Sequence, residues 1–121
     1  MEHTIRPASP KRGELWLVNF DPTIGSEIRK TRPAIILQND TANRYSPVTI
    51  VAAITTRTDE STYPTEVPLA PTRNLKNLSV ILLNQIRTID KRRIVKKLGS
   101  VKPDIMHAVD RALKISLALH D

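Results

Sequence analysis

Short apolar segments rich in β-branched residues, separated by polar turns that often contain proline, recur along most of this chain. Segments of this length and composition are typical of β-strands. The predicted strands are 14–20, 34–38, 48–55, 65–69, 79–88 and, more weakly, 95–98. The first of them is apolar on both faces, as expected of a strand that is packed on both sides. The pattern predicts a sheet of short antiparallel strands.

The periodicity of the sequence changes at Pro103. From there, apolar and small residues recur at the spacing of a helix with one buried stripe, at Ile105, Val109, Ala112, Leu113 and Ser116. Strands followed by one helix predict a mainly β fold, a small antiparallel barrel capped by a C-terminal helix. The pattern alone does not distinguish an SH3-like barrel from an OB-fold.

The remaining segments connect these elements. We expect turns at 39–47, a polar loop at 56–64 and, at 71–78, a connection with room for one helical turn. Residues 1–10 read as a loose N-terminal arm without the apolar centre of a signal peptide, and 11–121 as a single domain. No apolar run approaches the roughly 18 residues of a membrane span, so we expect no membrane partner.

Charge indicates the class of partner. The chain has 19 Lys and Arg against 12 Asp and Glu, a net charge of +7, which favours a polyanion such as nucleic acid. Aromatic residues are too scarce for a row of stacking platforms, so amide and carboxylate groups would have to read the bases. The absence of cysteine fits the cytoplasm. The cations form two clusters: Arg29, Lys30 and Arg32, and later Arg87, Lys91, Arg92, Arg93, Lys96 and Lys97.

The first basic cluster lies in a polar loop between two predicted strands. A cationic loop on a stiff pair of strands suits the binding of a phosphodiester, and the alternative interpretation is a solvated hairpin loop. The histidines, His3, His107 and His120, lie far from both basic clusters in sequence. This placement argues against a metal hydrolase and against a paired-histidine ribonuclease. We expect no metal and no cofactor.

Several sequence blocks resemble the MazF/PemK family of toxin endoribonucleases. The run 11–40, KRGELWLVNFDPTIGSEIRKTRPAIILQND, has the Gly-Glu-Leu-Trp strand start, Asp-Pro-Thr, Gly-Ser-Glu and Arg-Pro of that family. The resemblance extends over 11–119 and implies an SH3-like barrel, single-stranded RNA as substrate, a homodimer and an acidic cognate antitoxin. The later matching blocks are Asn39-Asp40, Tyr45-Ser46-Pro47, 52–55, 85–91 and Val109-Asp110 with Leu113.

The resemblance also implies that Arg32 and Thr55 are catalytic. RNA can be cut without a metal, because its 2′-hydroxyl attacks the adjacent phosphorus and leaves 2′,3′-cyclic phosphate and 5′-hydroxyl ends. A guanidinium fork matches the phosphorane oxygens of that reaction. Since the pKa of arginine exceeds ~12, Arg32 is expected to stabilise charge, and the proton acceptor stays open.

Two positions assign the chain to a branch of the family. The PemK branch has an Arg-x-Asp pair where this chain has Leu82 and Asn84, so the chain resembles the MazF branch. Where several relatives have glycines before Arg-Pro, this chain has the run 28–31, so the RNA sequence that it reads stays open. Glu27, Asn84 and Gln85 are the expected base readers. The full set of expected RNA-binding residues is Ser26, Glu27, Arg29, Lys30, Asn84, Gln85 and Arg87.

Two other functions are compatible with the same sequence. One is a gyrase-poisoning toxin on the same fold, and the other is a non-catalytic RNA-binding barrel. The pairing of Arg32 with Thr55 and the motif at 85–91 favour the ribonuclease.

Overall fold

The structure of the chain is a computed structural model that describes residues 9–22, 25, 27, 30–57 and 62–120. Two predicted RNA-binding residues, Ser26 and Arg29, and most of the predicted N-terminal arm lie outside the described residues.

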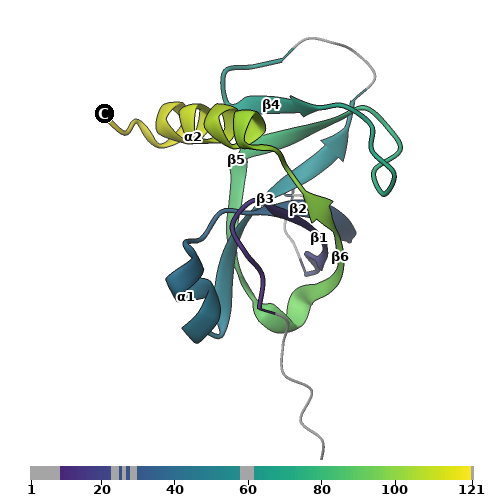
Figure 1. Ribbon diagram of the computed structural model, residues 1–121, viewed down its shortest axis with the longest axis vertical. Coiled ribbons are helices and arrows are strands. Elements are labelled where there is room, and N and C mark those ends of the chain that lie inside the picture. The colour runs from purple at the N-terminus through teal and green to yellow at the C-terminus, as the bar shows by residue number, and fades with distance from the viewer. Residues whose placement is uncertain (1–8, 23–24, 26, 28–29, 58–61, 121) are drawn as a thin grey trace, which may run out of the picture.

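Six antiparallel strands form one sheet in the order β4-β5-β3-β2-β1-β6 (Figure 1). Their order in the sheet differs from their order along the chain, so that β3 lies between β2 and β5 at the centre. The predicted class, mainly β with a C-terminal helix, is confirmed. The strands are β1 (Glu14–Asn19), β2 (Thr31–Ile36), β3 (Val48–Thr56), β4 (Glu66–Leu69), β5 (Ser79–Asp90) and β6 (Ile94–Ser100).

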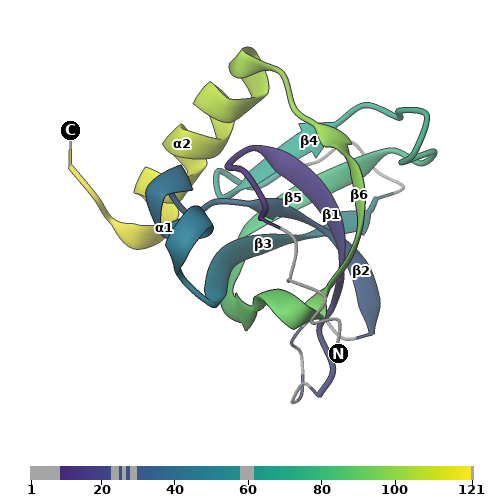
Figure 2. The same cartoon turned by 60° about the horizontal axis from the view of Figure 1, so that its bottom comes forward.

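The sheet is packed on both faces, as the two-sided apolarity of the first strand predicts. Figure 2 shows the sheet curling, and one of its faces carries a core cluster of its own. This inner cluster consists of Val18, Phe20, Ala34, Ile36, Val51, Ala53 and Ile89. The opposite face carries a second, helix-side cluster, which includes Leu15, Ile35, Ala52, Ile54, Ile81, Leu83, Val109 and Ala112.

The C-terminal helix covers the helix-side cluster. Helix α2 (Pro103–Leu117) packs against β4 and β5 and buries Val109 and Ala112, two of the residues of the predicted stripe (Figure 1). It ends at Ala118, which has a left-handed backbone (φ 55°), and the Leu119 N–H donates to the Lys114 carbonyl at 2.8 Å. This geometry is a common helix terminus.

The prediction of turns alone at 39–47 is wrong. Helix α1 (Asp40–Tyr45) forms there, because the Asn39 side chain accepts a hydrogen bond from the Ala42 N–H at 2.8 Å and so caps the first turn. The segment also buries Asn43 completely.

One further connection and the start of one strand differ from the prediction. Residues 71–78 contain a β-bridge between Thr72 and Leu75 instead of a helical turn. β2 begins at Thr31, three residues before the predicted start at 34, so Pro33 lies inside the strand. Because the ladder between β2 and β3 begins only at Ala34, the missing proline N–H falls at the end of that ladder.

Candidate functional site

The predicted catalytic pair lies on two neighbouring strands. β2 and β3 pair through Ala34–Ala53, Ile35–Ala52 and Ile36–Val51. The same register, continued by two residues, sets Arg32 opposite Thr55. Side chains alternate along a strand, so both lie on the face of the inner cluster to which Ala34 and Ala53 belong. Arg32 is exposed and Thr55 is half-buried.

A large bulge interrupts β5 next to this pair. Ile81 pairs with Ile54 of β3, but the next pair in the ladder joins Ile86 to Ala52. Ala53 alone therefore faces the four residues 82–85 of β5. Bulges re-aim side chains and are frequent beside active sites. This one carries Asn84, which is exposed, and Gln85, which is half-buried.

A cleft of about 350 Å³ opens beside the bulge. It is lined by apolar residues, by amide side chains, and by one acidic and one basic side chain. The structure thus brings four of the predicted RNA-binding residues to one place, although they come from segments far apart in sequence. Its lining residues are Phe20, Glu27, Ala53, Asn84, Gln85, Ile86 and Arg87.

Of the predicted residues that the structure describes, Arg32, Thr55 and Lys30 are not lining residues of the cleft. Arg32 and Thr55 are each two residues from a member of the Ala34–Ala53 pair, and Ala53 lines the cleft. Lys30 is exposed, has a left-handed backbone (φ 67°) and lies at the end of the loop before β2.

Phe20 is a cleft residue that the sequence analysis missed as a functional residue. It is buried at 2% exposure, and the Arg87 guanidinium lies 5.9 Å from its ring centroid. Arg87 Nη1 also donates to the Phe20 carbonyl at 2.6 Å, so one N–H of this arginine is used within the protein. The only available signal was the position of Phe20 as an aromatic residue where the strand meets the polar loop.

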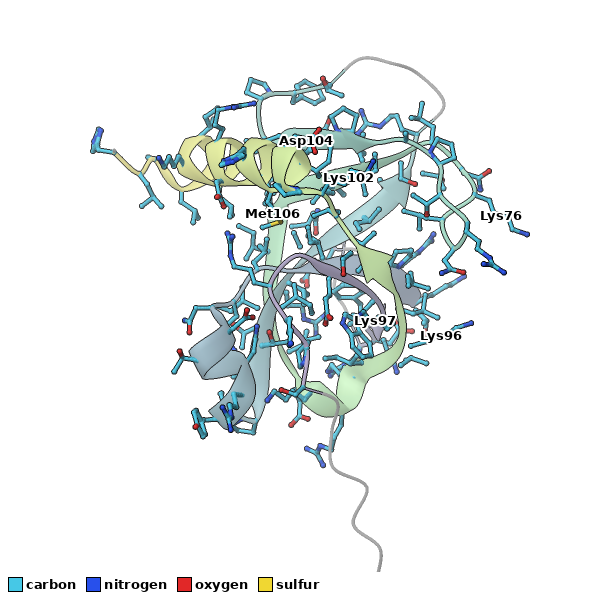
Figure 3. The ribbon with its side chains drawn as sticks, viewed as in Figure 1. Lys76, Lys96, Lys97, Lys102, Asp104 and Met106 are labelled. Atoms are coloured by element: carbon cyan, nitrogen blue, oxygen red, sulfur yellow. The ribbon has the colours of Figure 1, made fainter. Side chains whose placement is uncertain are left out.

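Most cations of the second basic cluster form hydrogen bonds or ion pairs within the protein. Lys91 is buried and donates to a backbone carbonyl of α1. Arg92 pairs with Asp90 at 3.0 Å, and Lys97 pairs with Glu14 at 2.8 Å. Two of the six cations are therefore paired with carboxylates, and Lys91 is buried, so these three are less open to an external polyanion than their clustering in sequence suggests. Lys76 and Lys96 point outward on the β6 side of the molecule (Figure 3).

Both carboxylates in these pairs have a lowered pKa. Hydrogen bonds from the Arg92 side chain and its backbone N–H lower the pKa of Asp90 to about 2. Partial burial acts to raise the pKa of Glu14. Hydrogen bonds from Lys97, from the Lys11 N–H and from the Trp16 indole together outweigh that effect, so the pKa lies below its ordinary value. Both groups are therefore ionised at neutral pH and hold cations of the fold.

Within 9–22, 25, 27, 30–57 and 62–120, no group of three or more His, Cys, Asp or Glu side chains is placed to hold a metal ion. In the same part of the chain, no helix has the length and apolar character needed to cross a membrane.

Comparison with known proteins agrees with the geometry. The family model for "PemK-like, MazF-like toxin of type II toxin-antitoxin system" matches residues 11–117. The chain is 46% identical over 112 residues to Endoribonuclease EndoA of Bacillus subtilis, with 92% of this chain and 97% of the relative covered.

Solved structures extend the similarity to the whole fold. MazF from Deinococcus radiodurans superposes with a TM-score of 0.77 at 29% identity, covering 90% of this chain and 96% of that chain. An endoribonuclease in complex with its cognate antitoxin, from a mycobacterial species, gives a TM-score of 0.75 at 25% identity, covering 93% and 98% of the two chains. The chain therefore belongs to the family of PemK-like, MazF-like toxins of type II toxin-antitoxin systems.

Proposed function

We propose that this toxin cuts single-stranded RNA, chiefly mRNA, at a short specific sequence and without a metal ion. The class of enzyme, an endoribonuclease, follows from the family and from the close similarity to EndoA along almost the full length of both chains. In the proposed reaction the RNA 2′-hydroxyl gives up its proton, and its oxygen attacks the adjacent phosphorus to form the 2′,3′-cyclic phosphate. The bond from phosphorus to the 5′-oxygen breaks, and that oxygen leaves as a 5′-hydroxyl after taking up a proton.

The observation that carries this proposal is the register of β2 and β3, which pairs Ala34 with Ala53 at the cleft and, continued by two residues, runs through Arg32 and Thr55. In our proposal the Arg32 guanidinium stabilises the charge that develops on the phosphorane oxygens, and the Thr55 hydroxyl donates to one of them. Donors held on paired strands are fixed before the reaction begins, which is the condition for effective electrostatic catalysis.

The cleft is the proposed site of base recognition. Glu27 can accept hydrogen bonds from a base, while the amides of Asn84 and Gln85 can both accept and donate. Ile86, which is half-buried, supplies apolar surface for the face of a base. Ser26, Arg29 and Lys30 are proposed to contact the backbone of the RNA, as is the remaining donor capacity of Arg87.

The proposed partners follow from the family. Several structural relatives are complexes with an antitoxin, among them MazE-MazF of Deinococcus radiodurans. We propose that an acidic cognate antitoxin restrains this toxin in the cytoplasm, and that the active form is a homodimer that blocks translation and growth when released.

The test uses the purified protein with excess EDTA and a long single-stranded RNA. We expect cleavage at one short motif, with 2′,3′-cyclic phosphate and 5′-hydroxyl ends, and no cleavage of duplex RNA or of DNA. End groups are identified by whether a polynucleotide kinase labels the 5′ ends without prior phosphatase treatment. A strict need for a divalent ion, or 5′-phosphate ends, would contradict the mechanism.

A further inference from the structure

Three consecutive backbone carbonyls at the end of β1 accept hydrogen bonds from arginine side chains. Arg93 Nη1 donates to the Asn19 carbonyl at 3.1 Å and also to the Asp21 carbonyl. Arg87 Nη1 donates to the Phe20 carbonyl between them, at 2.6 Å. We call Arg87 and Arg93, with these three carbonyls, the guanidinium clamp.

The clamp joins segments that are far apart in the chain. Arg87 belongs to β5, and Arg93 ends the short 3-10 helix Lys91–Arg93 that leads into β6. Arginine suits this task because it is always charged and its planar fork offers several donors in fixed directions. A lysine offers a single compact donor group on a flexible stem.

The other end of the same segment is also held. The Phe20 N–H donates to the Lys30 carbonyl at 2.9 Å, and the Lys30 N–H donates to Asp21 Oδ1 at 2.9 Å. The chain therefore leaves β1 and enters β2 at fixed points. Between these points lies Glu27, which lines the cleft together with Phe20.

We propose that Arg93 is a positioning residue for RNA recognition. It lines no wall of the cleft, but it holds the carbonyls on both sides of Phe20 and so fixes the part of the cleft wall that Phe20 forms. Loss of Arg93 then lowers the discrimination between RNA sequences more than it lowers the affinity that comes from electrostatic attraction to the RNA backbone. This inference rests on the proposed function, because it requires RNA to be read in the cleft.

The test compares Arg93→Met with Arg92→Met. Both residues belong to the same 3-10 helix and both variants lose one positive charge, but Arg92 pairs with Asp90 and takes no part in the clamp. For each protein, kcat/KM is measured on the preferred RNA and on RNAs with one changed base. Because a misplacement of about 1 Å can cost on the order of 10² in rate, we expect discrimination to fall about tenfold or more in Arg93→Met. Arg92→Met should discriminate like the wild type.

A second readout does not depend on activity. Hydrogen exchange at the Phe20 N–H reports whether the end of β1 is fixed, and we expect it to be about tenfold faster in Arg93→Met and unchanged in Arg92→Met. If Arg93→Met does not fold, Arg93→Lys, which keeps the charge but not the fork, is measured in the same way and should show the same two changes.

Equal discrimination in the two methionine variants, or unchanged exchange at Phe20, would overturn the positioning role. A loss of thermal stability in Arg93→Met without a change in discrimination would overturn it as well. If the wild type cleaves no RNA, the proposed function fails in the same assay, while the exchange measurement still tests the clamp.

Discussion

At the residue scale, the proposed chemistry depends on a guanidinium carried by a strand. Sequence places Arg32 at the end of a cationic loop, whereas the structure places it at the second residue of β2, across the extended register from Thr55. This difference matters because a strand residue is held by its ladder and can keep a fixed distance to its neighbour. Resemblance identified both residues and placed them at the opening of the second strand and the end of the third, and the structure adds that these two strands are neighbours in the sheet.

Replacement of Arg32 by alanine should abolish cleavage and leave the fold intact. Loss of one preorganised donor costs on the order of 10² to 10³ in rate, and an exposed side chain contributes little to stability. The matched control is Lys30→Ala, which removes an exposed cation two residues earlier and should weaken RNA binding without a comparable loss of kcat. Single-turnover cleavage separates the two effects. Normal cleavage by Arg32→Ala would show that the assignment is wrong.

At the element scale, local composition predicts the strands and the C-terminal helix. It fails for features whose structure depends on contacts between distant parts of the chain. The bulge in β5 lies within SVILLNQIRT, a run with no glycine or proline to mark an interruption. Helix α1 is a short polar segment without an apolar stripe, so no periodicity reveals it. Arg87 meets Phe20 across 67 residues, a pairing that no local pattern contains.

Helix α1 is held by a buried asparagine. Asn43 Oδ1 accepts hydrogen bonds from the Thr49 hydroxyl at 2.7 Å and from the Gln38 amide at 3.0 Å, and Asn43 Nδ2 donates to the Gln38 carbonyl at 2.8 Å. The side chain thus ties α1 to β3 and to the segment after β2. Its partners would be left without these bonds if it were removed, and buried polar groups without partners are costly.

We therefore predict that Asn43→Ala destabilises the protein by about 2–3 kcal/mol, because several buried polar groups lose a partner at once. Asn39→Ala, at the cap of the same helix, should cost about 1 kcal/mol, since it removes a single exposed capping bond. Urea denaturation of both variants gives the comparison. Equal losses of unfolding free energy would show that the buried network contributes no more than the cap.

At the scale of the whole molecule, only part of the net charge of +7 is open to a partner. Several cations are paired within the fold, such as Arg12 with Asp110 and Arg57 with Glu66. A polyanion is therefore attracted only by the cations that lie beside the cleft and on the strand that carries Arg32. An RNA strand and an acidic antitoxin segment would compete for the same cations.

This competition gives the last prediction. A fluorescent RNA bound to the cleavage-deficient Arg32→Ala variant should be released in full as the cognate antitoxin is added, because both ligands neutralise the same cations. Antitoxin in which the acidic residues of the binding segment are changed to serine is the control, and it should release the RNA only at much higher concentration. Raising the salt concentration should weaken both complexes, as expected when binding releases counterions.

Light scattering of the free toxin at micromolar concentration belongs to the same experiment, because a homodimer can offer the RNA two copies of the strand that carries Arg32. A monomer would contradict the proposed assembly. A stable ternary complex, with RNA still bound after saturation by antitoxin, would show that the two ligands occupy separate surfaces. Inhibition would then have to act at a distance from the cleft, and the charge argument would no longer explain how the toxin is restrained.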